Sequence, residues 1–302
     1  MIRVGTCSWT EKTLIRSGEF YPDIVKTAED RLRYYAGSFD TVEVDSTYYA
    51  IPDMRNTSLW ADRTPGDFIF HIKVYGALTG HGIDPKTLPK DIFNLLPDKD
   101  KTGKHIYIKE PHLLQIIAGR FKEALSPLQR SNKLGVLVFQ FPPWFQYKTA
   151  NLDYILSRKE LMSGLPVAVE FRHGSWLTSG SLDAVLRLFR KHRLTYITVD
   201  EPQYGNLATA PFFPSVTTDT AYFRFHGRNK ENWLKKGVET SLRFAYLYSD
   251  EELKEFMPSI QDADEKAAVT YVMFNNCHGG FAMKNALRLK GLLSRQKTGG
   301  LE

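Results

Sequence analysis

The sequence predicts an α/β fold, a single (β/α)8 barrel of the TIM type, from three observations. The chain has 302 residues, which is enough for eight strand–helix units. Short apolar runs alternate with longer amphipathic segments along the whole chain. The short runs are apolar almost throughout, as expected for parallel strands covered on both faces. A doubly wound sheet is the alternative, but the turn Cys7-Ser8-Trp9-Thr10 after the first run lacks the usual glycine-rich sequence.

The expected elements follow one another in strand–helix order. The candidate strands are residues 2–7, 41–45, 68–73, 134–141, 166–171, 195–199, 221–226 and 269–275. The candidate helices are residues 27–36, 55–63, 111–125, 152–162, 181–191, 250–260 and 281–294. The link between the sixth and seventh strands, residues 200–219, is expected to be mostly loop because it contains Pro202, Gly205, Pro211 and Pro214.

A long insertion follows the third strand, and its segment Ile106-Tyr107-Ile108 is a candidate short strand. This insertion spans residues 74–110, and a connection of that length without secondary structure in a compact domain is usually either functional or a sign that an element has been missed. We assign residues 1–296 to one barrel domain. Residues 297–302 are expected to be a disordered tail, and their ending, Gly299-Gly300-Leu301-Glu302, resembles a vector-derived extension.

Composition excludes several classes of protein. With 42% hydrophobic and 25% charged residues, the chain is not of the disordered type. Two cysteines, Cys7 and Cys277, are too few for a disulfide framework, a four-cysteine zinc site or an iron–sulfur cluster held only by cysteine. The net charge of +6 permits an anionic partner without identifying it. The start of the chain lacks a signal-peptide pattern and no apolar run is long enough for a membrane helix, so we predict a cytoplasmic protein without a membrane partner.

Charged residues recur at alternate positions near the ends of the candidate strands. Because alternate side chains of a barrel strand face the interior, these residues should point inward near the carboxyl-end rim. The pairs are Glu43 and Asp45, His71 and Lys73, Glu170 and Arg172, and Arg224 and His226. Further polar residues end other strands, namely Gln140, Asp200, Asn275 and Asn276. We interpret this convergence as a binding or catalytic pocket, and the alternative is a buried ion-pair network that only fixes the barrel interior.

The mixture of acids and bases favours proton transfer. A cation can keep one carboxylate ionised while burial raises the pKa of another. We therefore predict Glu43 and Glu170 as acid and base, with Lys73, Arg172 and His226 as further catalytic residues, and expect Glu170→Gln to abolish turnover without affecting folding. A divalent metal held by Glu43, Asp45, Glu170 and His226 is less favoured because cations stand beside them.

Basic residues and glycines gather after the seventh and eighth strands, where barrel enzymes often bind phosphate. Arg224 and Arg228, with the turn Gly279-Gly280 at a helix start, form a candidate anion site. The last helix adds four cations, Lys284, Arg288, Lys290 and Arg295. They either contribute to this anion site or form a basic face exposed to solvent. Aromatic residues after strand ends are candidates for stacking on a nucleotide or nucleic acid, or for loop anchors: Trp9, Tyr48, Tyr49, Trp144, Phe145, Trp176, Tyr204 and Trp233.

Six ordered blocks resemble the domain of unknown function 72 family, also called YecE-like, over nearly the whole chain. They are Gly5 to Trp9, Val42 to Pro52, Phe139 to Pro143, Val169 to Trp176, Phe223 to Arg228, and Phe274 to Asn276 followed by Gly280, Ala282, Asn285 and Ala286. The resemblance implies a TIM barrel similar to the endonuclease-IV-like and xylose-isomerase-like superfamily. It implies no activity, and the histidine-rich metal cluster of endonuclease-IV-like proteins is not carried over.

These observations lead to three hypotheses. The first is an enzyme with a pocket at the carboxyl-end rim that acts on a small phosphorylated or nucleic-acid-derived substrate. The second is a non-catalytic DNA- or RNA-binding barrel, and the third is a metal-assisted phosphodiester hydrolase. The predicted substrate-binding residues are Trp9, Asp45, Tyr48, Gln140, His173, Trp176, Asp200, Arg224, Arg228, Asn275, Asn276 and Asn285.

Overall fold

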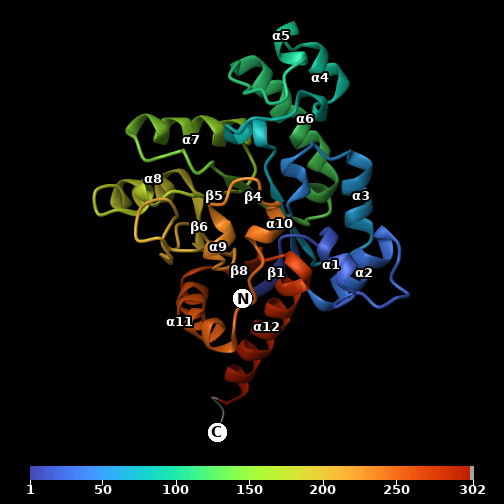
Figure 1. Cartoon of the computed structure of the whole chain (residues 1–302), viewed down its shortest axis with the longest axis vertical. Helices are drawn as coiled ribbons and strands as arrows, with labels where there is room; N and C mark the ends of the chain where they lie inside the picture. Colours follow the sequence, from blue (N-terminus) through green and yellow to red (C-terminus); the bar gives the residue numbers. More distant parts are fainter. Residues whose placement is uncertain (300–302) are drawn as a thin grey trace.

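The computed structural model describes residues 1–299 and confirms the barrel (Figure 1). Its strands are β1 (Ile2–Thr6), β2 (Thr41–Val44), β3 (Ile69–Lys73), β4 (Leu134–Gln140), β5 (Val167–Glu170), β6 (Leu194–Asp200), β7 (Thr220–Phe225) and β8 (Val269–Phe274). Each strand pairs in parallel with the next one along the chain, and β8 pairs with β1, so the sheet is closed. All carboxyl ends therefore meet at one rim.

All seven candidate helices form the outer layer. They are α2 (Ala28–Ser38), α3 (Met54–Asp62), α6 (Pro111–Arg130), α7 (Thr149–Leu161), α8 (Leu182–His192), α11 (Asp250–Lys266) and α12 (Phe281–Gly299). Short helices that the sequence analysis did not predict are α1 (Lys12–Ser17), α4 (Lys90–Asn94), α5 (Asp98–Lys101), α9 (Lys230–Trp233) and α10 (Thr240–Arg243). The 3-10 helices are η1 (Ser46–Tyr48), η2 (Gly76–Thr79), η3 (Pro85–Thr87), η4 (Gly174–Leu177) and η5 (His278–Gly280).

Local sequence explains where the long helices begin. Thr27 and Asp30 form a reciprocal capping box before α2, and Ser249 and Glu252 form another before α11. Pro111 opens α6 at a position where its missing N–H group costs nothing. These caps supply hydrogen bonds to backbone groups that a helix end leaves without partners.

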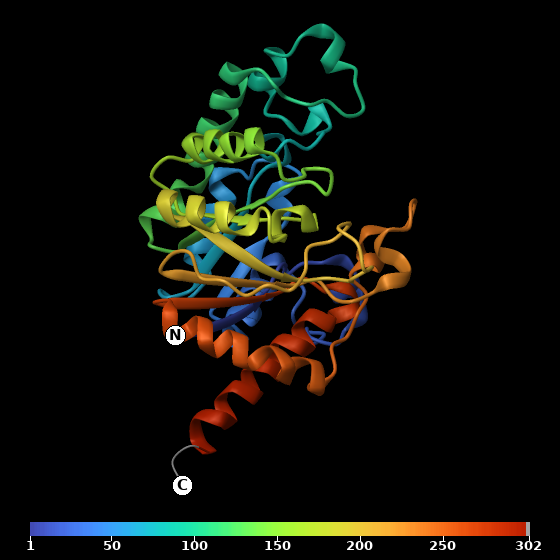
Figure 2. The same ribbon diagram turned by 90° about the vertical axis from the view of Figure 1, so that its left-hand side faces the viewer.

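Two connections depart from a regular barrel. The β6–β7 link, residues 201–219, contains no helix, as expected from its prolines. The insertion after β3 folds into η2, η3, α4 and α5 and lies beside α6, at the top of the molecule in Figures 1 and 2. Within it, Ile106 makes one antiparallel bridge with Ile83, so the expected strand is reduced to a single pair.

The described part of the chain begins at Met1, which pairs with α11, and ends within α12. Residues 297–299, which the sequence analysis placed in a tail, are the last residues of α12, and residues 300–302 lie outside the described part of the chain. The Met1 ammonium group forms an ion pair of 2.6 Å with Asp264 of α11. None of the helices described is long and apolar enough to cross a membrane.

The core has two layers. The larger cluster lies between the barrel and its helices and includes Phe70, Phe121 and Phe223. A smaller cluster fills the barrel interior and consists of Cys7, Val136, Val138, Ala168, Ile197, Val199, Ala210, Tyr222, Tyr271 and Met273. The interior is thus packed rather than open.

Candidate active site at the carboxyl ends of the strands

The polar side chains that end the strands form one connected group, which we name the rim cluster. It consists of Glu43, Asp45, Lys73, Gln140, Glu170, Arg172, Glu201, Arg224, His226 and Asn275. Below it lies His71, fully buried, with its ring 4.1 Å from that of Tyr271 and 5.0 Å from that of Tyr222. His71 Nδ1 accepts a 3.1 Å hydrogen bond from the Val136 N–H, and burial lowers the pKa of His71 to about 3. This neutral histidine belongs to the packed floor.

Arg224 is the centre of the rim cluster. Its guanidinium group is fully buried and donates to the carboxylate of Glu170 and, at 2.7 Å, to Glu43. It also donates to Gln140 at 3.2 Å and lies 3.8 Å from the Cys7 sulfur. Arg224 of β7 therefore connects side chains of β2, β4 and β5. This agrees with the prediction that alternate residues of each strand point into the barrel.

Glu43 is a carboxyl group with a raised pKa. Burial raises the pKa of Glu43 to about 7 against the opposing charge of Arg224. The carboxyl group of Asp45 raises this pKa further, through its charge and through a hydrogen bond. Tyr222 donates a 2.9 Å hydrogen bond to Glu43 from the floor. Glu43 can therefore gain and lose a proton near neutral pH, and Asp45 connects it to the surface, since the Asp45 side chain is 27% exposed.

Glu170 has the opposite behaviour although it is equally buried. Burial opposes its ionisation, but Arg224 and Arg172, together with a hydrogen bond from His226, hold its pKa well below the usual range. His226 is neutral, because burial lowers its pKa to about 3. Its Nδ1 accepts from the Asn275 amide at 2.8 Å, which leaves the proton on Nε2, 3.3 Å from Glu170. Glu170 therefore favours the ionised form, whereas its sequence position predicted a catalytic acid or base.

Glu201 is a member of the rim cluster that the sequence analysis missed. Its carboxyl group lies 3.0 Å from Arg172 and accepts a 2.7 Å hydrogen bond from the Ala210 N–H. Burial raises the pKa of Glu201 to about 7. The Arg172 guanidinium also lies 4.9 Å from the centre of the Trp233 ring, which belongs to α9. Figure 2 places the α9–α10 segment over this end of the barrel.

Two cations of the rim cluster reach the surface. The Lys73 side chain is 13% exposed and that of Arg172 is 11% exposed. Lys73 lies 5.0 Å from the centre of the Tyr48 ring and 3.5 Å from Asp45. The buried polar atoms of the rim cluster are mostly paired with one another: Arg172 Nε lies 3.0 Å from Glu201 Oε2, and His226 Nε2 lies 3.3 Å from Glu170. The partly exposed cations Lys73 and Arg172 are therefore the groups of the rim cluster that a ligand could reach.

Four predicted binding residues lie on the other side of the sheet. Asp200 is paired with Phe225 in the register and faces the helix layer, where it binds Arg228 at 3.0 Å and accepts a 2.6 Å hydrogen bond from Tyr248. The other two are Asn276 and Asn285, which bind each other at 2.8 Å. Asn285 also bonds to the backbone N–H and C=O of Tyr248. These four residues hold α11 and α12 on the barrel and do not join the rim cluster.

Three aromatic or imidazole residues predicted to bind substrate have structural contacts. Trp9 is buried edge-on against Trp60 and Phe70 outside the barrel. Trp176 is fully buried, stacks on Phe171 at 4.2 Å and donates to a backbone carbonyl. His173 Nδ1 accepts a hydrogen bond of 3.2 Å from the backbone N–H of Ser175 at the start of η4, so its described contacts cap a turn. Among the predicted aromatic residues, Tyr48 contacts the rim cluster through Lys73, and Trp233 contacts it through Arg172.

The predicted anion site after β8 is covered. The Gly279 N–H donates to Thr13 of α1 at 2.7 Å, and Leu14 and Glu19 lie within 4 Å of a Cβ built at Gly280. Two cations of α12 are paired, Lys284 with Glu19 at 3.1 Å and Arg288 with Asp250. The α1 segment, which the sequence analysis did not predict, thus occupies the space expected for an anion.

Metal binding finds no support in the geometry. Within residues 1–299 no group of three or more histidine, cysteine, aspartate or glutamate side chains is placed to hold a metal ion. The four candidate metal ligands are Glu43, Asp45, Glu170 and His226. The three carboxylates lie beside Arg224, and His226 contacts Glu170. A guanidinium group therefore takes the place among these carboxylates that a cation would need.

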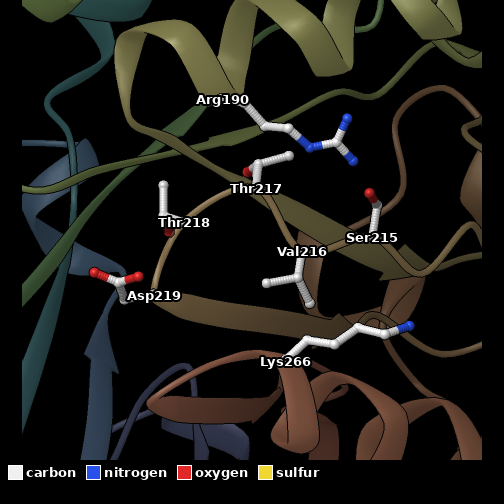
Figure 3. A pocket seen from close by; sticks show the side chains of 7 residues that line it. All are labelled: Arg190, Ser215, Val216, Thr217, Thr218, Asp219 and Lys266. Carbon is white, nitrogen blue, oxygen red and sulfur yellow. The ribbon is translucent and has the colours of Figure 1, made fainter.

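A shallow pocket of about 530 Å³ lies at the opposite end of the barrel (Figure 3). It is lined by Arg190, Ser215, Val216, Thr217, Thr218, Asp219 and Lys266. Its Thr217 hydroxyl donates to a backbone carbonyl at 2.7 Å, and its Lys266 pairs with Asp262 at 2.6 Å. Because active sites of TIM barrels lie at the carboxyl ends of the strands, we place the candidate site at the rim cluster instead.

Comparisons with known proteins agree with this architecture. The model of the family described as "Protein of unknown function DUF72" matches residues 3–301. The chain is 30% identical to the UPF0759 protein YunF of Bacillus subtilis, over 99% of this chain and 97% of YunF. A crystal structure of a DUF72 family protein from Enterococcus faecalis superposes with a TM-score of 0.79, at 27% identity over 97% of this chain and 96% of that one. One from Thermotoga maritima gives 0.77, at 33% identity over 97% and 99%.

Proposed function

The chain belongs to the DUF72 family, and we propose that it is an enzyme whose rim cluster transfers protons to and from a small anionic substrate, either phosphorylated or derived from nucleic acid. The observation that carries this proposal is the pair of Glu43 and Asp45. Glu43 is fully buried with a pKa of about 7, and Asp45 joins it to the surface. A carboxyl group with a pKa near the working pH is suited to general acid–base catalysis.

Charge supports an anionic substrate. The ionisable residues of the rim cluster, apart from neutral His226, are the cations Lys73, Arg172 and Arg224 and the carboxyl groups Glu43, Asp45, Glu170 and Glu201. When Glu43 and Glu201 are protonated, two carboxylates remain against three cations. Lys73 and Arg172 are the accessible cations, so they would bind the anionic group next to Asp45.

The proton path follows from these contacts. Glu43, protonated when the anionic substrate binds, would pass its proton through Asp45 to the substrate. Arg224 keeps Glu43 from becoming permanently protonated, because its charge lowers the pKa of Glu43. The reverse transfer, from the reacting substrate through Asp45, would return a proton to Glu43 and close the cycle. Glu170 positions Arg224 and Arg172 throughout.

The two alternative functions have less support. A nucleic-acid-binding barrel requires unpaired cations beside β7 and β8, but Arg228, Lys284 and Arg288 pair with carboxylates. A metal-assisted hydrolase requires a set of metal ligands, and Arg224 stands among the carboxylates that would provide them.

The test is a turnover screen with pools of phosphate esters and nucleotides, read by mass spectrometry. We expect the wild-type protein to convert at least one compound. Glu43→Gln should lower that rate by about 100-fold or more, the usual contribution of a general acid or base, while circular dichroism stays native. Arg190→Gln, in the pocket at the opposite end, is the matched control and should keep the wild-type rate. Conversion at the wild-type rate by Glu43→Gln would refute the proposal.

A further inference from the structure

We infer that the substrate carries a planar aromatic ring, as a nucleoside 5′-monophosphate does, and that Trp144 stacks on this ring while Lys73 binds the phosphate. This inference rests on the proposed function, because it uses the same cation. The aromatic ring would be the part of the substrate that does not react. Trp144, which lies outside the rim cluster, would then determine specificity for it.

Trp144 is exposed on a turn that is held in place from below. It follows β4 after Pro142 and Pro143, and its side chain is 62% exposed. The next residue, Phe145, turns inward and stacks on Phe141 with ring centres 4.5 Å apart. The Phe145 carbonyl accepts a 2.6 Å hydrogen bond from Trp176, which is fully buried. The turn is therefore anchored, and the Trp144 ring is presented to solvent without having to be ordered by the ligand.

A continuous series of rings connects Trp144 to the cation. The ring centres of Trp144 and His81 are 5.9 Å apart, and those of His81 and Tyr48 are 5.1 Å apart. The Lys73 ammonium group lies 5.0 Å from the centre of the Tyr48 ring. Tyr49, whose side chain is also 62% exposed, packs edge-on against Tyr48. An exposed aromatic surface thus ends at a charged group that binds anions, which matches a ligand with a flat ring at one end and a phosphate at the other.

His81 adds a hydrogen-bond acceptor to this surface. The Thr79 hydroxyl donates its one hydrogen to the Gly76 carbonyl at 3.1 Å and lies 2.9 Å from His81 Nδ1. Both contacts are hydrogen bonds only when Nδ1 carries the proton and donates to Thr79. His81 Nε2 is then an acceptor, and burial keeps the ring neutral by lowering its pKa to about 4. The N–H groups of nucleobases can donate a hydrogen bond to such a nitrogen.

The experiment compares the four nucleoside 5′-monophosphates with ribose 5-phosphate by titration calorimetry. We expect at least one nucleotide to bind the wild-type protein roughly tenfold or more tightly than ribose 5-phosphate, the range of base–aromatic stacking. Trp144→Ala should remove this preference and Trp144→Phe should keep most of it. Lys73→Ala should weaken the binding of both kinds of ligand. Leu95→Ala, at a side chain of the insertion that is 58% exposed, is the matched control and should leave both affinities unchanged.

The outcomes separate the inference from the proposed function. Equal affinity for nucleotides and ribose 5-phosphate, with both weakened by Lys73→Ala, would overturn the inference and leave the proposed function standing. A nucleotide preference that persists in Trp144→Ala would overturn the assignment of Trp144. Absence of binding by any phosphate compound would contradict both. A preference lost in Trp144→Ala and kept in Trp144→Phe would support the inference.

Discussion

The substitutions Glu43→Gln and Glu170→Gln should change stability with opposite pH dependences. The folded-state pKa of Glu43 is about 7, above its ordinary value of 4.5, so the folded wild-type protein holds a proton that the unfolded chain loses between these values. Wild-type stability therefore falls as pH rises from 4.5 to 7, by on the order of 3 kcal/mol from this group. A glutamine side chain cannot ionise, so Glu43→Gln should gain about this much stability relative to wild type over that interval.

Glu170 contributes in the opposite direction. Its pKa is held low in the folded protein, so its contribution is present above the ordinary carboxyl pKa and is lost as pH falls through the folded-state value. At pH 7, Glu170→Gln should lower the free energy of unfolding by about 3–5 kcal/mol, because Arg224 stays buried with one carboxylate partner fewer. For a chain of 302 residues this is a decrease in Tm of roughly 5–8 °C. The sequence-based expectation that Glu170→Gln leaves folding unaffected is therefore revised.

The assay is urea unfolding followed by circular dichroism at several pH values from about 2.5 to 8, because the contribution of Glu170 changes only below its ordinary pKa of 4.5. The destabilisation of Glu170→Gln should shrink towards the acid end, and that of Glu43→Gln should shrink towards pH 7. Asp98→Asn, at an exposed ion pair with Lys101, is the control and should follow the wild-type curve. If the two glutamate variants differ from wild type by the same amount at every pH, the ionisation states assigned to the rim cluster are wrong.

Three further outcomes test the fold and the site. Gly135→Ala should lower the free energy of unfolding by about 1–3 kcal/mol, because its Cβ would lie 2.4 Å from His71 Nδ1; thermal unfolding measures it, and an unchanged Tm would contradict the packing of the floor. Asn285→Ala should cost about 3 kcal/mol, since it leaves the buried backbone groups of Tyr248 without partners; hydrogen exchange at that amide should speed up. Asp45→Asn should lower turnover by about 100-fold and leave Tm nearly unchanged, and a large loss of stability would instead mark Asp45 as structural.

Strand parity is the part of the site that the sequence predicted best. Glu43, Glu170 and Arg224 each stand in an apolar run, where a charged side chain has only the interior rim as a favourable place. The structure brings these three side chains into direct contact. Their ionisation states could not be predicted, because they depend on distances between strands that are far apart in the sequence.

The parity of β6 could not be read in the same way. All seven residues of β6 are buried, so the sequence pattern does not show which of them face the barrel interior and which face the helices. Two acids follow one another at its end, and the outer one, Asp200, was chosen although Glu201 faces Arg172. The bulky Tyr196 was an available signal, because a large ring packs in the helix layer, and Asp200 is on the same face as Tyr196.

The basic region beside β8 was misjudged for a different reason. The sequence of α12 contains Lys284 and Arg288 but not the acids that pair with them. Those acids, Glu19 after α1 and Asp250 at the start of α11, lie elsewhere in the chain. Covering of the Gly279–Gly280 turn by α1 is likewise a tertiary contact. Pairing of this kind becomes visible only once the barrel has closed.

The position of Arg224 has a consequence for how the chain folds. Its partners Gln140 and Glu170 are 84 and 54 residues away, and Glu43 is 181 residues away in the other half of the barrel. A half-barrel would have to keep these charges hydrated, because burying any of them alone is unfavourable. Such long separations predict slow folding in which the two halves close together, with charge compensation and exclusion of water from the interior occurring in the same late step.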